Sequence, residues 1–450
     1  MATFDFSEKL PFGEMFLVRS SEIEGRIDPL YYQTIHNFIF AKQKKYTVSK
    51  MVDCIDMQRG RFGHRPRNDP KLYGGDYPFI QTGDIVKASQ NAGKITYSQT
   101  LNKLGLKTSR LQTEKAVILT IAANIGDTAI LDYPACYPDS LIALTPKSDD
   151  LRLEYINIYF KFIKSFLEDL APQAAQKNIN YQQLAPVPIV IPPLAVQDEI
   201  IRIYENALLA RNSKQKQAQT LLTSINDYLL GELGITLPET DNSLNSRIFT
   251  VQMSEVGGGA FDPFTQFNKH YRIEGGKYPN ERLDNIAFLQ KGQSITSDDI
   301  VSGDYPVIAG GQSSPYSHNV CNHKGNVITV SASGAYSGYV WYHDYSIFAS
   351  DCTVIFSKDE NKLITEFLAE VLKVKQQEIY LLQKGAGQPH VYPNDLAKLN
   401  IPLPDKPTQQ KIIAHIQAIK AQATALQAEA EQLLSQAKAE IEQMILGGAQ

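Results

Sequence analysis

An internal repeat constrains this chain more than any other feature, because a duplicated segment is expected to fold twice into the same module. The segment GDYPFI at residues 75–80 recurs as GDYPVI at residues 303–308, at an offset of 228. Farther along, residues 176–192 match residues 388–404 through a Gln-x-x-Ile/Val motif and downstream Leu, Ile and Pro positions, at an offset of 212. The sequence therefore predicts two copies of one module in a single chain.

The change in offset shows where the copies differ. It falls from 228 to 212, so the first copy carries about sixteen extra residues between Asp84 and Asp139. This interval overlaps the basic segment 59–110, which has ten Lys or Arg residues against three Asp residues. The copies thus differ most where a ligand is expected to be recognised.

Each copy is predicted to be a mixed α/β module. Short runs rich in β-branched residues and bounded by Gly, Asn and Pro indicate strands, and apolar residues at helical spacing indicate a helix after them. The predicted strands are residues 117–121, 128–131 and 141–144 in the first copy and 327–330, 338–342 and 353–356 in the second, and the helices cover 155–170 and 363–372.

Each copy ends in a long helix with the apolar seam of a coiled coil, in which spacings of four and three alternate. The seam of the last helix runs from Ile412 to Met444 with a break near Glu440, and the central seam contains the polar residues Arg211 and Gln215. Helices of roughly 35–40 residues would be about 50–60 Å long. We expect them to pack on each other antiparallel and to hold two domains apart, and a coiled coil between two chains is the alternative. The apolar residues expected to contact a partner are Ile201, Leu208, Leu222, Ile416, Leu426 and Leu433.

These elements predict an α+β fold, with two similar mixed α/β domains joined by two long helices in an antiparallel coiled coil. The 450 residues suffice for two or three domains, since a domain usually has roughly 100–200 residues. The predicted boundaries are 1–195 for the first domain, 196–236 for the central helix, 237–405 for the second domain and 406–450 for the C-terminal helix.

Composition and motifs argue against several classes of protein. No apolar run approaches the ~20 residues of a membrane-spanning helix, and the N-terminus lacks the order of a signal peptide, so we expect a cytoplasmic protein without a membrane partner. The four cysteines lie far apart without a Cys-x-x-Cys pair, which argues against zinc and disulfides and indicates buried thiols. No nucleotide-binding loop, zinc-protease motif or nucleophile elbow is present, so we expect no enzyme.

Two short motifs resemble catalytic or phosphate-binding sequences only in part. Residues 257–264, GGGAFDPF, match part of an amino methyltransferase motif, but the second proline is missing and Asp28-Pro29 stands at the same place in the first copy. This motif is therefore predicted to belong to the repeated scaffold. Residues 385–387, GAG, follow a predicted helix, whereas phosphate loops usually run from a strand into a helix, so they are predicted to form a structural turn.

Taken in order, the repeated motifs resemble the specificity subunit of type I restriction-modification enzymes. The resemblance rests on the duplicated YPFI/YPVI strand, on the duplicated Gln-x-x-Ile/Val with downstream Ile and Pro, and on Gln197 and Gln409 at the start of the long helices. It covers nearly the whole chain. It implies two target recognition domains that each read one half of a split sequence in double-stranded DNA, with the helices as a spacer.

The same resemblance implies a subunit with neither catalytic activity nor cofactors of its own. Its partners would be DNA methyltransferase subunits, two of them, and restriction/translocase subunits, and S-adenosylmethionine, ATP and Mg would belong to those partners. Two similar but unequal modules suit two different half-sites at a fixed separation. The alternative from another class is a coiled-coil adaptor with two protein-binding domains, which the net charge of −4 favours.

The candidate DNA contacts follow from comparing the copies, because shared positions are expected to be scaffold or backbone contacts and differing positions to read bases. Arg, Lys and Gln pair with base edges, and Ser or Tyr reach phosphates. For each candidate, a solvated surface residue or a turn former is the alternative. The first copy contributes Arg59, Arg61, Arg65, Arg67, Gln81, Thr82, Lys103, Lys107, Arg110 and the shared Gln176. The second copy contributes Lys291, Gln293, Gln312, Ser313, Tyr316, Ser331, Ser333, Tyr336, Lys384, His390 and the shared Gln388.

Overall fold

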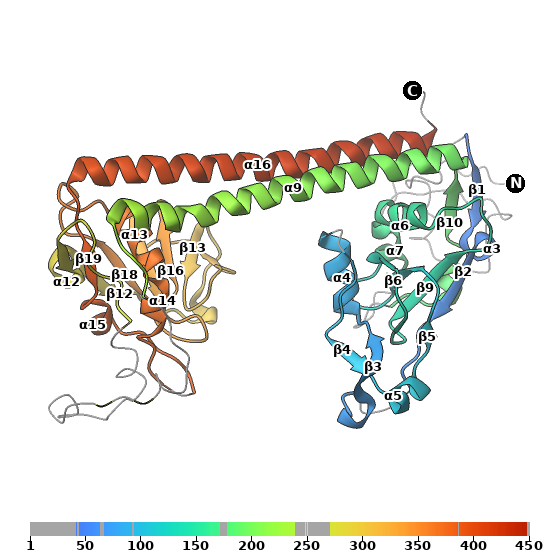
Figure 1. Cartoon of the computed structure of the whole chain (residues 1–450), viewed down its shortest axis with the longest axis horizontal. Helices are drawn as coiled ribbons and strands as arrows, with labels where there is room; N and C mark the ends of the chain where they lie inside the picture. Colours follow the sequence, from blue (N-terminus) through green and yellow to red (C-terminus); the bar gives the residue numbers. More distant parts are fainter. Residues whose placement is uncertain are drawn as a thin grey trace, which may run out of the picture. The chain divides into compact units, whose positions relative to one another are not determined.

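The chain divides into two compact units, which we describe separately (Figure 1). The computed structural model describes residues 42, 45–63, 67–91, 94–171, 178–238, 248, 250, 271–385 and 387–447. Unit 1 comprises Met1–Lys214 and Ala428–Gln450, and unit 2 comprises Gln215–Gln427. The long helices α9 (Leu194–Leu233) and α16 (Lys406–Leu446) each contribute one half to each unit.

A four-stranded antiparallel sheet in the order β2-β9-β6-β7 is the centre of unit 1. Strand β6 is buried along its whole length, because both of its faces are covered. Val117 and Leu119 pack in the core that contains α6, and Ala116 and Ile118 pack in the core that contains α4. The elements of this layer are β2 (Ile55–Arg59), β9 (Leu141–Pro146), β6 (Ala116–Thr120), β7 (Thr128–Leu131), α4 (Thr82–Asn91), α6 (Leu153–Phe162) and α7 (Lys164–Leu170).

Two smaller sheets complete unit 1. One pairs β1 with β10 antiparallel, and the other has the order β4-β3-β8-β5. Their elements, with the short helices beside them, are β1 (Thr47–Lys50), α3 (Met51–Cys54), α8 (Tyr181–Leu184), β10 (Pro188–Ile191), η2 (Pro70–Leu72), β3 (Tyr73–Phe79), β4 (Gln99–Leu101), α5 (Lys103–Thr108), β5 (Leu111–Gln112) and β8 (Ala135–Cys136).

Unit 2 repeats this topology. Its central sheet has the order β12-β18-β15-β16, β11 pairs with β19, and a small sheet has the order β14-β13-β17. The elements are β11 (Asn280–Arg282), α12 (Leu283–Ile286), β12 (Ala287–Lys291), η4 (Ser297–Asp299), β13 (Tyr305–Ile308), β14 (Ser317–His318), β15 (Val327–Ser331), β16 (Val340–His343), β17 (Phe348–Ala349), β18 (Cys352–Ser357), α13 (Thr365–Val374), α14 (Gln376–Tyr380), α15 (Pro393–Leu396) and β19 (Asn400–Pro402). The predicted fold class of two similar α/β modules with two long helices is confirmed.

The repeat extends to individual hydrogen bonds at the start of each long helix. The side chain of Gln197 accepts the N–H of Arg152 at 2.9 Å and donates to the carbonyls of Asp150 and Pro192 at 2.9 and 2.8 Å. Gln409 makes the same three bonds, each at 2.9 Å, to the residues 212 positions farther along, Ile364, Lys362 and Pro404. Both glutamines are completely buried. Each one satisfies three backbone groups and so fixes its helix to the α/β module.

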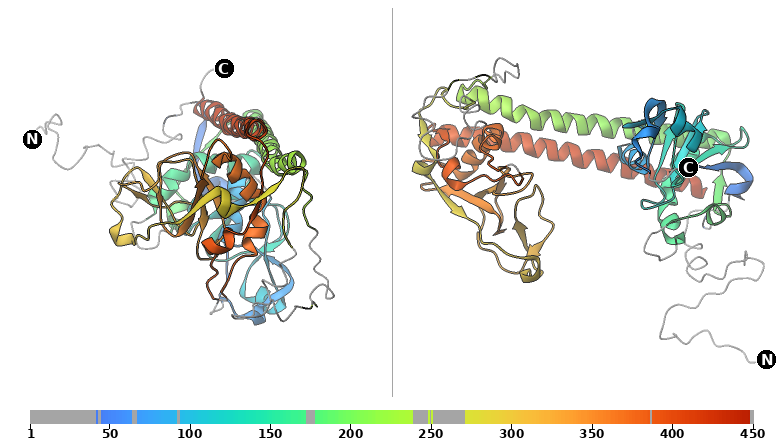
Figure 2. Two further views of the ribbon diagram at one scale, coloured as in Figure 1. Left: turned by 90° about the vertical axis from the view of Figure 1, so that its left-hand side faces the viewer. Right: turned by 90° about the horizontal axis from the view of Figure 1, so that it is seen from below.

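Within each unit the two long helices run antiparallel, and two views show them side by side (Figure 2). The cross-helix contacts are Arg211–Glu431 and Lys214–Glu429 in unit 1, and Tyr228–His415 and Glu232–Lys411 in unit 2. The residue numbers of each pair add to 642 or 643, so the same antiparallel register holds in both units. The helices therefore pair within one chain, and the coiled coil between two chains is not needed to cover their seams.

The predicted seam is the buried stripe of these helices. Ile412, Ile416, Ala423, Ala430 and Ala437 of α16 are all at most 6% exposed. The predicted break of the spacing near Glu440 is confirmed: Glu440 is exposed, and the stripe continues one position later through the fully buried residues Ile441 and Ile445. The residues predicted to contact a partner lie in this intramolecular stripe: Ile416 is buried, and the half-buried ones are Ile201, Leu208, Leu222, Leu426 and Leu433.

The extra residues of the first copy lie where the change of offset places them. Between β3 and β6, unit 1 contains α4, β4, α5, β5, whereas unit 2 has only β14 between β13 and β15 among the described residues. The prediction of four buried thiols holds for Cys136 and Cys352, while Cys54 and Cys321 are half-buried. No helix in the described ranges is long and apolar enough to cross a membrane.

Candidate nucleic-acid interface

A glycine directly after the first strand of each central sheet sets the position of a basic side chain. A Cβ atom on Gly60 would lie 2.1 Å from the carbonyl oxygen of Pro138, and one on Gly292 would lie 2.0 Å from another backbone oxygen. Only glycine allows the backbone to pass this closely. Arg59 and Lys291 stand directly before these glycines, so both modules present a cation at the end of the same strand.

In unit 1 the arginines predicted to bind DNA gather around one aspartate. Arg67 Nη2 lies 2.5 Å from Asp139 Oδ1, and Arg59 Nε donates to the carbonyl of Asp139 at 2.7 Å. Arg110 Nη1 donates to the carbonyl of Arg59 at 3.0 Å. Each guanidinium has five N–H donors, and all three residues, like Arg61, are exposed. The cluster is thus oriented by the protein while donors remain for phosphates or base edges.

A polar cavity of about 650 Å³ opens beside this cluster, between β2, β5 and β9. Arg59, Arg110, Gln58 and Gln112 line it, together with Asp56 and Glu114, so it offers donors and acceptors of both signs. Burial raises the pKa of Tyr137, which donates to the carbonyl of Gln58 at 3.4 Å, to about 12. This phenol stays neutral and supports the wall of the cavity.

Two other predicted contacts of unit 1 hold the start of α4. Gln81 Nε2 donates to Gln99 Oε1 at 2.5 Å, and the Gln81 N–H donates to Asp84 Oδ2 at 2.9 Å. The hydroxyl of Thr82 lies 3.1 Å from that of Ser140. Gln81 is exposed and Thr82 half-buried, and both are hydrogen-bonded within the module, whereas Lys103 and Lys107 are exposed on α5.

In unit 2, three loops come together around Asp351, the counterpart of Asp139. The hydroxyl of Ser333 donates to the Asp351 carboxylate. The N–H of Gly334 donates to the carbonyl of Pro389 at 3.1 Å, and Ser333 also forms an isolated backbone bridge with His390. The same aspartate position therefore orders an arginine in unit 1 and a serine loop in unit 2.

The candidates of unit 2 separate into exposed and engaged residues. Ser331 is only 3% exposed, and its hydroxyl contacts the carbonyls of Ala309 and Gly311 at 3.5 and 3.4 Å, so it supports a loop and is no surface contact. Lys384 Nζ is paired with Asp395 at 2.6 Å. The exposed candidates are Lys291, Gln293, Gln312, Ser313, Tyr316, Tyr336 and Gln388, and Ser333 and His390 are half-buried.

Three sets of predicted residues lie outside the residues that the structure describes. Arg65 and Gln176 are the candidate DNA contacts in this group. The motif at 257–264 and its counterpart Asp28-Pro29 in the first copy are also outside it. The turn at Gly385 has a φ of +106°, as the prediction of a structural glycine turn requires.

The sequence model of the family described as "Type I restriction modification DNA specificity domain" matches residues 39–223 and 277–436, which is most of the chain. The chain belongs to this family. The two matched regions are the two modules of the repeat, so each module is a DNA specificity domain. The interface around Asp139 and the interface around Asp351 are accordingly the candidate DNA-reading surfaces of two specificity domains.

The chain is similar to several solved structures at low sequence identity, and the one with a TM-score above 0.5 supports its fold. One of these structures comes from work on the complex assembly and conformational transition of the type I R-M system. It is 13% identical, the match covers 90% of this chain and 97% of that chain, and the TM-score is 0.52. The S subunit from M. genitalium is 15% identical, the match covers 90% of this chain and 98% of that chain, and the TM-score is 0.44. The HsdS subunit from Thermoanaerobacter tengcongensis is 14% identical, the match covers 90% of this chain and 97% of that chain, and the TM-score is 0.37.

Sequence reasoning missed the residues that organise the two specificity domains. Asp139 and Asp351 stand at the offset of 212 in the two copies, but no signal in the sequence assigned them to the sites that they order. Gln58, Gln112 and Thr113 line the cavity beside the arginines. Gln112 lies two residues after Arg110 in the sequence, so the alternation of a short strand could have placed it on the same surface.

Proposed function

We propose that this specificity subunit binds an asymmetric bipartite target in double-stranded DNA, with one half-site read by each module. The observation that carries the proposal is the difference between two interfaces on one repeated scaffold. Unit 1 presents Arg59, Arg61, Arg67 and Arg110, whereas the exposed candidates of unit 2 are mainly Gln, Ser and Tyr. Side chains of such different chemistry pair with different base edges, so the two half-sites are unlike.

The helix pair serves as the spacer in this proposal. The antiparallel register is the same in both units, and buried Gln197 and Gln409 anchor the helices to their modules through identical hydrogen bonds. A rigid connection between two readers fixes the number of base pairs between their half-sites.

The chain itself is proposed to be non-catalytic and to direct partner subunits to the target. Methyltransferase subunits, two in number, and restriction/translocase subunits would carry the chemistry with S-adenosylmethionine, ATP and Mg, in the cytoplasm. The described residues contain no cluster of three or more His, Cys, Asp or Glu side chains suited to a metal. The adaptor alternative loses its support, because it rested on net charge while the family assigns DNA specificity.

Selection from random duplexes tests this proposal. The purified complex with its methyltransferase is incubated with a random duplex library, and bound DNA is sequenced over several rounds. We expect two unlike half-sites at one separation. A single uninterrupted motif, or binding that shows no preference over heparin, would contradict it.

A further inference from the structure

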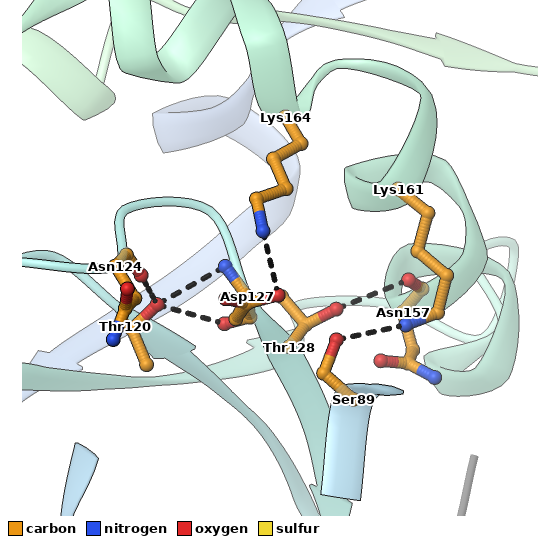
Figure 3. A network of polar contacts seen from close by, with 8 residues as sticks. All are labelled: Ser89, Thr120, Asn124, Asp127, Thr128, Asn157, Lys161 and Lys164. Carbon is orange, nitrogen blue, oxygen red and sulfur yellow. Dashed lines mark hydrogen bonds and ion pairs between the residues drawn. The ribbon is translucent and has the colours of Figure 1, made fainter. Parts of the chain in front are cut away.

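A cavity of about 220 Å³ in unit 1 lies where α4, α6, α7, α9 and α16 meet, and it shares no lining residue with the cavity beside the arginine cluster. Four cationic side chains and a single carboxylate, Asp127, line it. Asp127 is already paired, because its Oδ1 lies 2.8 Å from Lys164 Nζ (Figure 3). The cations of the lining are Lys161, Lys164, Arg211 and Lys438.

Positive charge in this cavity is incompletely balanced. Arg211 contacts Glu431 at 3.3 Å and donates to the carbonyl of Gln90 at 3.4 Å. Lys161 Nζ donates to Ser89 Oγ at 3.3 Å (Figure 3). In the part of the chain that the structure describes, neither Lys161 nor Lys438 has an ion-pair partner within 4.0 Å. Lys438 is exposed, so water surrounds its charge, whereas Lys161 is half-buried. A half-buried ammonium group without a counter-charge is unfavourable.

Burial has the largest influence on the pKa of Lys161. Burial lowers the pKa of Lys161 to about 8, the nearby Asp127 acts in the opposite direction, and Lys438 and Lys164 lower it further. An anion in the cavity would raise this pKa again, because an opposite charge favours the charged form.

Unit 2 has an internal anion at the corresponding place. Lys373 is the counterpart of Lys161 at the offset of 212, and its Nζ lies 2.9 Å from Glu370 Oε1. Lys420 of α16 contacts the same oxygen at 2.7 Å. The Glu370 side chain is only 4% exposed, and its counterpart in unit 1 is the buried residue Ile158. Ile158 lines a larger adjoining cavity that shares Lys161. Unit 1 thus has an apolar residue three positions before the lysine, where unit 2 has the carboxylate that pairs with it.

The walls of the cavity are specific to unit 1. Ser89 and Gln90 belong to α4, which has no counterpart in unit 2 among the described residues. An adjoining cavity of about 380 Å³ shares Lys161 and is lined by Asn157, whose buried Oδ1 has no hydrogen-bond partner. The other cations of that cavity are paired, Lys115 with Glu154 and Lys94 with Asp132. The unbalanced charge is therefore concentrated at the smaller cavity.

We propose that the smaller cavity binds a phosphate-type oxyanion, which takes the role that the Glu370 carboxylate has in unit 2. Ammonium and guanidinium groups that converge from four elements match the several acceptor oxygens of phosphate. The ligand is either free inorganic phosphate or a phosphodiester group of DNA. This inference does not rest on the proposed bipartite target, because the site is defined without DNA.

Thermal unfolding of the full chain with inorganic phosphate tests the site. Phosphate is titrated against chloride at matched ionic strength, and we expect a saturable rise in the unfolding temperature. Lys161→Met should weaken phosphate affinity at least about tenfold, the loss of one charge-assisted contact. Ile158→Glu supplies the carboxylate of unit 2 and should remove the phosphate response. The control Lys216→Met, on an exposed residue of α9, should keep it.

Two outcomes overturn the proposal: a response to phosphate no larger than that to chloride, or a response that persists unchanged in both Lys161→Met and Ile158→Glu. The source of the anion is then assigned with duplex DNA and the methyltransferase complex. If a DNA phosphodiester occupies the cavity, Lys161→Met lowers the salt slope of duplex binding by about one, and inorganic phosphate competes with DNA. If free phosphate is the ligand, the slope stays the same. Either result supports the oxyanion site.

Discussion

Replacing Arg59, Arg61 and Arg67 together by alanine is expected to weaken binding of the methyltransferase complex to its target duplex by about 100-fold at physiological salt. The three side chains are exposed, and Asp139 orders two of them. Each phosphate contact contributes about 0.9 to the slope of log affinity against log salt concentration, so losing three should reduce the slope by about 2.7. Fluorescence anisotropy titrations at several salt concentrations measure both quantities.

A charge-conserving variant separates the role of charge from that of base recognition. With Arg59, Arg61 and Arg67 all replaced by lysine, the salt slope should stay close to that of the parent, because the charges remain. Discrimination between the target and altered half-sites should fall, since lysine lacks the planar fork that pairs two acceptors. Unchanged affinity and slope in the alanine variant would remove this segment from the interface.

Lys375→Ala is expected to lower the free energy of unfolding of the chain by about 3–5 kcal/mol. The Lys375 side chain is 1% exposed, its Nζ lies 2.5 Å from Glu378 Oε2, and it also donates to the carbonyl of Ile273. Burial lowers the pKa of Lys375, and Glu378 opposes this shift. The alanine variant leaves the Glu378 carboxylate in the interior without its cation. Urea unfolding followed by circular dichroism measures the loss.

Unit 1 supplies the matched control for this prediction. At the offset of 212, Ile163 and Phe166 stand in place of Lys375 and Glu378, and both are completely buried. The double variant Lys375→Ile with Glu378→Phe should therefore recover most of the stability lost in Lys375→Ala, because no charge is left unpaired. If the double variant is less stable than Lys375→Ala, the expectation fails, and the buried ion pair stabilises unit 2 in a way that apolar packing cannot replace.

The sequence predicted those parts of the fold that depend on apolar periodicity and on the repeat. A continuous apolar run predicts a strand that is covered on both faces, as β6 is. Alternating spacings of four and three predict a helix with one buried face, as in the stripe through Ile416 and Ala423. The shift of the stripe to Ile441 was missed because Glu440 occupies the expected position, and only the packing shows that the neighbouring isoleucine replaces it.

The candidate site was harder to predict, because its order comes from contacts between distant residues. Arg67 and Asp139 are 72 positions apart, and no spacing rule connects them. Ser331 is a polar residue at the end of a strand, a position that is often exposed. Here the loop that contains Ala309 and Gly311 contacts its hydroxyl and covers it. The repeat aligns Ile158 with Glu370, but only the packing shows that Glu370 is the counter-charge of Lys373 and that Lys161 has no such partner among the described residues.

The central claim is that two modules read two half-sites whose separation is set by the helix pair. It is tested most directly by removing one heptad from both helices at facing positions, residues 215–221 of α9 and residues 422–428 of α16. This deletion keeps both seams in phase and shortens the helix pair by about 10 Å, or roughly three base pairs at 3.4 Å per step.

Selection from random duplexes is then carried out with the deletion variant and with the parent chain, each assembled with the methyltransferase. The account predicts that both half-sites are retained and that the number of base pairs between them decreases. Retention of both half-sites at the original separation would contradict it, because the helix pair would then not determine the spacing.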